Sequence, residues 1–177
     1  GIATAYMDSS PVVFITCNVS EPLLGKDSFQ EVDITGIAMP ITKATYLVRD
    51  PQTIPDVMRQ AFAVAATGRP GPVLIDFLKN VTAPSVEIDY EFIPWKQNRA
   101  CTSIQALATS HDLKTPEPDQ EDVDKLAEMI AQAQRPLLIC GGGVVRGRAD
   151  KEFKELAEKL DAPVAITVMG GGGFPGD

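Results

Sequence analysis

Glycine-rich turns follow two apolar runs in the second half of the chain. The first is CGGG at residues 140–143, after LLI. It fits the dinucleotide pattern G-x-G-x-x-G only in part, because Gly141 and Gly143 take the first two places and Arg146 takes the third. The acid that this pattern requires about 20 residues further on is replaced by Thr167, Val168 and Met169. A nicotinamide site is therefore disfavoured.

The second glycine run is GGGG at residues 170–173, after VAITVM. Two neighbouring strand ends without side chains form a crevice at the carboxyl edge of a sheet, where α/β proteins bind ligands. The pattern favours an extended ligand close to the backbone, and the alternative is that these glycines only permit tight turns.

Other chemistries have little support. His111 is the only histidine and lies in a polar stretch typical of a solvated loop, and Cys17, Cys101 and Cys140 are too scattered for a disulfide framework or a zinc site. The net charge of -8 disfavours nucleic acid and acidic membrane surfaces as partners. No apolar run approaches the ~20 residues of a membrane span, so we expect a cytoplasmic protein.

Elements that position these turns can be predicted from periodicity. In the first half, we expect a helix over residues 1–10, buried strands at 12–16 and 73–77, and an extended run at 43–48. We expect a further helix with Thr53 as N-cap, Pro55 in its first turn and a stop at Gly68. The apolar stripe of that last helix comprises Ile54, Val57, Met58, Ala61, Phe62 and Ala65.

The second half repeats the alternation of helix and strand. Residues 86–119 are rich in proline and predict a linker. A helix capped by Asp119, with a stripe of Val123, Leu126, Ala127, Ile130 and Ala131, precedes the strand LLIC; a helix at 150–161 and a strand at 164–168 follow. This order predicts an α/β fold with three-layer open parallel sheets. Because the first helix has no N-cap and the last sheet is small, we expect a fragment of a longer protein.

Several stretches, taken in order, resemble the catalytic large subunit of acetolactate synthase, a thiamine-diphosphate enzyme. They are GIATAYMDSSP, DSFQEVDITGI, TGRPGPVLID, LKNV, CGGG and ITVMGGGGFP, and they cover nearly the whole chain. The resemblance implies that residues 1–85 are the C-terminal half of a pyrimidine-binding domain. Residues 86–119 would be a linker, and residues 120–177 the first part of a Rossmann-like central domain that contacts FAD.

The family condenses two pyruvates, or pyruvate and 2-oxobutyrate, with loss of CO2, on the route to branched-chain amino acids. The resemblance therefore implies thiamine diphosphate, Mg2+ and FAD as cofactors, 2-keto acids as substrates, a homo-oligomer and a possible regulatory small subunit. FAD does no net redox chemistry in this reaction. The chain alone is expected to be inactive, because the family's activating glutamate and metal motif match no residues in it.

Site residues follow from the same resemblance. Phe29 and Gln30 match residues facing thiamine diphosphate and the substrate channel, and Lys79 matches a lysine at the channel mouth. The residues matched to FAD contacts are Arg69, Gly141, Gly142, Gly143, Thr167, Val168 and Met169. For Gln30 and Lys79 the alternative is a solvated surface residue, and for Arg69 an ordinary loop cation.

The chain also departs from the family pattern. Cys17, Asn18 and Ser20 stand where glycine, glutamine and proline are usual, which bears on any cofactor contact there. Ser10, Leu78 and Asn80 are further differences. Glu31 and Asp33 are interpreted as ordinary loop carboxylates. The alternatives are a related enzyme, such as glyoxylate carboligase or pyruvate oxidase, and a nucleotide-binding or protein-interaction module without catalysis.

Overall fold

The structure is a computed structural model that describes residues 1–89 and 117–176. The chain divides into two compact units, Gly1–Pro116 and Glu117–Asp177. Most of the predicted linker, together with His111 and Cys101, lies outside the described residues. Within the described ranges, no helix is long and apolar enough to cross a bilayer.

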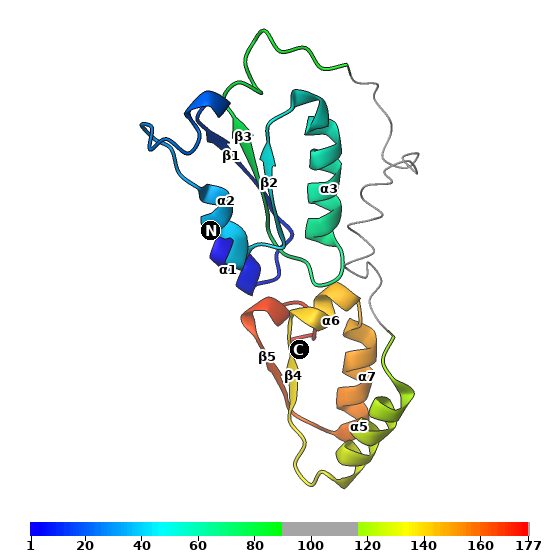
Figure 1. The fold of residues 1–177 in the computed structure, drawn as a ribbon. Helices are drawn as coiled ribbons and strands as arrows, with labels where there is room; N and C mark the ends of the chain where they lie inside the picture. Colours follow the sequence, from blue (N-terminus) through cyan, green and yellow to red (C-terminus); the bar gives the residue numbers. More distant parts are fainter. Residues whose placement is uncertain (90–116, 177) are drawn as a thin grey trace. The chain divides into compact units, whose positions relative to one another are not determined.

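The first unit is a parallel sheet with helices on both faces (Figure 1). Its strands β1 (Val13–Asn18) and β2 (Ala44–Val48) each pair with the central strand β3 (Val73–Leu78), in the order β1-β3-β2. The α-helices are α1 (Ile2–Met7), α2 (Ile34–Ala38) and α3 (Ile54–Ala66). The short 3-10 helices are η1 (Glu21–Leu23), η2 (Met39–Ile41) and η3 (Pro51–Thr53).

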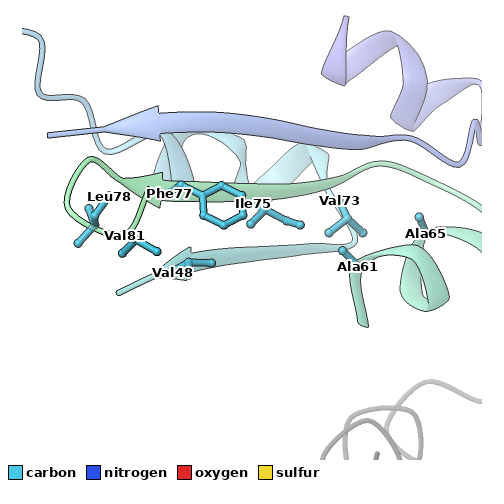
Figure 2. Close-up of a cluster of buried hydrophobic side chains, with 8 residues drawn as sticks. All are labelled: Val48, Ala61, Ala65, Val73, Ile75, Phe77, Leu78 and Val81. Carbon is cyan, nitrogen blue, oxygen red and sulfur yellow. The ribbon is translucent and has the colours of Figure 1, made fainter. Parts of the chain in front are cut away.

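The hydrophobic core of this unit lies between β3 and α3. Alternate side chains of β3, including Val73 and Ile75, pack with Ala61 and Ala65 of the helix (Figure 2). Every residue of β3 is buried, as its continuous apolar sequence predicts. For the first strand the same prediction is wrong, because β1 pairs along one edge only and Ile15 is exposed.

Helix α3 begins and ends close to the predicted residues. Pro55 lies in its first turn, and Gly68 adopts a φ of 57°, the left-handed conformation of a helix stop. Thr53 does not cap with its side chain, because its hydroxyl donates to the carbonyl of Asp50 at 2.7 Å. Phe62 is 55% exposed while Gln60 is buried, so the prediction for Phe62 in the apolar stripe is wrong.

The carboxyl end of α3 is held by a lysine that precedes β2. The Lys43 ammonium donates to the carbonyl of Thr67 at 2.5 Å and also to that of Val64. These are carbonyls of the last helical turn, where a cation also meets the negative end of the helix dipole. Burial lowers the pKa of Lys43.

The second unit contains one β-α-β crossover of parallel strands. Strands β4 (Leu138–Cys140) and β5 (Val164–Ile166) pair directly, and α6 (Gly142–Gly147) and α7 (Asp150–Leu160) connect them (Figure 1). Before them, α5 (Gln120–Gln132) begins at Asp119, whose carboxylate accepts from the Glu121 amide at 3.0 Å, so this predicted cap is confirmed. The parallel sheets of both units confirm the α/β class.

Two details of the second unit differ from prediction. The strand at 164–168 is shorter, because Val168–Gly170 forms the 3-10 helix η5. The stripe on α5 is not a core face within the described residues, since no residue of that helix is buried and Leu126 is 56% exposed.

We expect Lys43→Met to lower the free energy of unfolding by about 1–3 kcal/mol, because two helix carbonyls lose a charged donor. Urea denaturation followed by circular dichroism measures the change. Lys26→Met is the control, because Lys26 is exposed. Equal stability of the two variants would contradict the anchoring role of Lys43.

Candidate functional site

A pocket of about 340 Å³ lies at the carboxyl ends of β1 and β3 in the first unit. The residues that line it are Cys17, Asn18, Val19, Ser20, Leu23, Phe29, Gln30 and Lys79. The structure thus brings together Phe29, Gln30 and Lys79, the three residues predicted to act in catalysis. Parallel pairing aligns Cys17 with Phe77 and Asn18 with Leu78, and the Lys79 amide donates to the Asn18 carbonyl at 3.1 Å, so the ends of both strands lie at the pocket.

Phe29 and Gln30 reach this pocket from the loop between η1 and α2. Gln30 has a φ of 64°, in the left-handed region that residues with a Cβ seldom adopt. The Phe29 side chain is 88% exposed. A strained backbone and a solvent-facing aromatic ring in one turn are unusual for a residue pair that only connects elements, and such positions cluster at functional sites.

Glu31 fixes the loop that carries these two residues. Its carboxylate accepts from the amides of Ser28 at 3.1 Å and Lys26 at 3.3 Å, from the Ser28 hydroxyl at 3.1 Å, and from the Gly25 amide. Hydrogen bonds from the Gly25 and Ser28 amides lower the pKa of Glu31. Glu31 is therefore more than an ordinary loop carboxylate, because it closes the loop on itself.

Asp33 has a similar local task at the start of α2. Its carboxylate accepts from the Gly36 amide at 2.9 Å and from the Thr35 hydroxyl at 2.8 Å. The bond from the Gly36 amide is the main cause of a lowered pKa for Asp33. Asp33 is thus the N-cap of α2.

A buried polar cluster beneath the pocket was not predicted from the sequence. Asp76 of β3 is 1% exposed and accepts from the Thr16 hydroxyl and the Asn18 amide, each at 2.8 Å. The Asn18 amide also donates to the Val32 carbonyl at 3.0 Å. Two features of the sequence could have indicated this cluster. Thr16 and Asn18 are polar residues at alternate positions of β1, and Asp76 is an acid within the otherwise apolar strand β3.

The second predicted site, in the second unit, is the edge where β4 and β5 end. The Thr167 amide donates to the Cys140 carbonyl at 3.0 Å, which places residues 141–143 beside residues 167–169. A Cβ added to Gly170 would overlap the Cys140 carbonyl, and one at Gly142 would lie 3.0 Å from the Met169 carbonyl oxygen. Close backbone packing therefore explains Gly142 and Gly170 without a ligand.

Other positions on the same edge are open. A Cβ at Gly143 would meet nothing within 4 Å, and one at Gly141 would meet only the Thr167 hydroxyl oxygen at 3.9 Å. The side chain of Val168 is 96% exposed. This part of the edge has room for a flat ligand, and the assignment of its residues to FAD binding stays a prediction.

Arg69 makes contacts within the first unit. Its Nε donates to the Ser9 hydroxyl at 2.7 Å, and one terminal nitrogen lies 3.5 Å from the Met7 carbonyl oxygen. Ser9 is buried and has a φ of 54°, so Arg69 stabilises a tight turn after α1. This role accounts for part of the donor capacity of Arg69, and its predicted flavin contact stays a prediction.

The pocket can orient a small anionic molecule through its polar and charged side chains. Its lining contains neutral amides, the Lys79 ammonium and the Phe29 ring, together with the Cys17 thiol and the Ser20 hydroxyl. Such a set can hold a small anion and align its carbonyl group. Among the described residues, no group of three or more potential metal ligands is found.

Comparison with known proteins finds one family model and several similar proteins. Residues 123–177 match the model of the thiamine pyrophosphate enzyme central domain. The whole chain is 42% identical to the "Probable acetolactate synthase large subunit" of Methanocaldococcus jannaschii, over 177 residues and 28% of that protein. Residues 123–177 are thus similar to the central domain of thiamine pyrophosphate enzymes.

Two further relatives are also named as acetolactate synthase large subunits. The chain is 38% identical over 177 residues to the large subunit of Buchnera aphidicola subsp. Schizaphis graminum, and 35% identical over 175 residues to the isozyme 3 large subunit of Escherichia coli. It covers 29% of each of these proteins. The chain thus corresponds to under a third of the length of these relatives.

We expect the loop at residues 25–31 to open in acid. The lowered pKa of Glu31 means that its stabilising bonds are fully present above 4.5, its ordinary value, and are lost as pH falls through the lower folded value. Amide hydrogen exchange of Gly25 and Ser28 should therefore rise, after correction for intrinsic rates, as pH is lowered from 4.5 through the folded pKa of Glu31.

Glu31→Gln should exchange faster at pH 7 and lose this acid dependence. Asp27→Asn is the matched control, because it removes a carboxylate from the same loop and should retain the wild-type pH profile. A Glu31→Gln profile that still follows the wild type would contradict the role of Glu31.

Two glycine substitutions test which glycines of the second unit are required for close packing and which face open space. Gly170→Ala should lower stability by about 1–3 kcal/mol or more through overlap with Cys140. Gly143→Ala should leave stability unchanged or raise it by up to about 1 kcal/mol, because Gly143 lies in a helix and faces open space. Thermal unfolding compares them, and equal losses would show that the open edge is wrongly described.

Proposed function

We propose that the complete protein containing this chain is an acetolactate synthase catalytic subunit. It would convert two pyruvates and a proton into 2-acetolactate and CO2, or use 2-oxobutyrate as the second keto acid. The similarity over the whole chain to acetolactate synthase large subunits is the observation that carries this proposal. The convergence of Phe29, Gln30 and Lys79 on one pocket supports it.

Thiamine diphosphate, when bound, supplies the carbon nucleophile that attacks the keto group and accepts the electrons left by CO2. This chain's residues would act on the substrate side. The Lys79 ammonium attracts the carboxylate of a 2-keto acid to the pocket. The Gln30 amide offers both a donor and an acceptor to orient a carbonyl group without adding charge. Phe29 supplies an apolar surface at the pocket lining.

The fit of the cofactors to the described residues differs from one to the next. The open backbone at Gly141 and Gly143, with Val168 beside it, has the free space that a flat flavin requires. The pocket around Gln30 has the volume and polar character for part of a thiamine group or a keto acid. Mg2+ finds no fitting ligand set among residues 1–89 and 117–176, so this chain's residues are given no role in holding it.

The domain assignment is proposed from the family resemblance. We assign residues 1–85 to the C-terminal half of a pyrimidine-binding domain and residues 120–177 to the first part of the central domain. The match of residues 123–177 to the central-domain family supports the second assignment. A homo-oligomer and a regulatory small subunit are proposed as partners of the complete protein.

Purified complete protein, supplied with thiamine diphosphate, Mg2+ and FAD, should form acetolactate from pyruvate. Product analysis with pyruvate and with glyoxylate separates acetolactate synthase from glyoxylate carboligase. Absence of acetolactate under these conditions would overturn the proposal.

Lys79→Gln should raise KM for pyruvate by roughly 5-fold, because an exposed charge pair contributes about 1 kcal/mol. The value of kcat should change less, and added salt should reduce the difference between variant and wild type. Lys151→Gln is the control, because it removes an equal charge from an exposed position in the other unit. An unchanged KM for pyruvate in Lys79→Gln would show that Lys79 does not contribute to substrate binding.

A further inference from the structure

The buried carboxylate of Asp76 is the starting point, because burial of an ionisable group requires partners. Its two oxygens accept one bond each, from the hydroxyl of Thr16 and from the amide of Asn18, both at 2.8 Å. Thr16 and Asn18 are two residues apart on β1 and therefore point to the same face of the sheet. Both partners are neutral, so hydrogen bonding alone satisfies this carboxylate in the contacts described.

Asn18 differs from Thr16 because its amide reaches beyond the sheet. Its Nδ2 donates both to Asp76 and, at 3.0 Å, to the carbonyl of Val32 in the pocket loop. Its Oδ1 accepts from the Val19 amide at 2.8 Å, and Val19 is part of the pocket wall. One side chain thus connects the buried centre of the sheet, the wall of the pocket and the loop that carries Gln30.

The geometry of this connection constrains the loop. Val32 lies two residues after Gln30, and its carbonyl also accepts from the Ile34 amide at 2.8 Å, at the start of α2. Glu31 closes the loop internally but makes no bond to the sheet among its recorded partners, which lie at residues 25–28. The bond from Asn18 is therefore the side-chain tether that joins the Gln30 segment to β1 and β3.

We propose that Asn18 is the positioning residue of the Phe29–Gln30 turn and that Asp76 orients the Asn18 amide for this task. The functional consequence rests on the proposed function, because it requires Gln30 to face the 2-keto acid. The tether itself depends only on the hydrogen bonds of the first unit. Loss of the tether should release the turn, weaken substrate binding and leave the sheet intact.

An exchange of the two residues isolates the tether. Asn18→Asp alone places two carboxylates in contact and risks misfolding. In the double variant Asn18→Asp with Asp76→Asn, the new amide at position 76 donates to the new carboxylate at position 18. The amide oxygen at position 76 still accepts from the Thr16 hydroxyl, and the carboxylate at position 18 still accepts from the Val19 amide. The double variant leaves no side-chain donor at position 18 for the Val32 carbonyl.

Thr16→Val is the matched control. It removes the other 2.8 Å bond to Asp76 but makes no recorded contact with the loop. It should lower the stability of the whole unit without a selective effect on the turn.

The first readout is amide hydrogen exchange in the complete protein. In the exchanged double variant, the amides of Glu31 and Ile34, which donate to the carbonyls of Ser28 and Val32, should exchange roughly 5- to 10-fold faster than in the wild type, as expected for the loss of one hydrogen bond. Amides of β3 should retain their protection. In Thr16→Val, any increase should be shared by β1 and β3 rather than confined to the turn.

The second readout is the division between KM and kcat for pyruvate. The double variant should raise KM several-fold more than Thr16→Val does at equal folded fraction. If amide exchange in the turn is equally fast in the double variant and in Thr16→Val, the proposal that Asn18 holds the turn is overturned. If the complete protein makes no acetolactate, the proposed function fails, while the exchange experiment still decides whether Asn18 holds the turn.

Discussion

The pairing of β3 on both of its edges is the constraint on which the first unit depends. This strand is buried along its whole length, so each of its side chains must find a partner inside the protein. On one face, Val73 and Ile75 pack against α3; on the other, Asp76 must be satisfied by hydrogen bonds. The packing against α3 and the hydrogen bonds to Asp76 together fix the position of β1 and of the loop before α2 that is bonded to it.

Parallel pairing then explains why a pocket forms where it does. Strands that run in one direction end at one edge, and the segments that follow β1 and β3 line the pocket there. The loop before α2 adds Phe29 and Gln30 to the same edge. A few local carboxylates maintain this arrangement, because Glu31 closes the loop and Asp33 caps the helix that follows it.

Sequence periodicity predicted the strands β1 to β5 and the helices α1, α3, α5 and α7, but it did not predict α2 or the helix α6 in the glycine turn. Periodicity also predicted that Lys79 follows the end of a strand. That Gln30 lies near Lys79 was predicted from the family resemblance alone, because a long loop separates Gln30 from the strands. Burial could not be predicted for Ile15 or Phe62, since it depends on which neighbours cover each face. The close packing of Gly170 on Cys140 also involves residues distant in sequence, so local pattern favoured a ligand there.

The left-handed backbone of Gln30 has a consequence for protein engineering. A residue with a Cβ in this conformation costs about 1–3 kcal/mol, whereas glycine adopts it freely. Selection for heat resistance alone would therefore favour glycine at position 30 and discard the amide. Retention of glutamine under such selection would measure how much the organism depends on that one side chain.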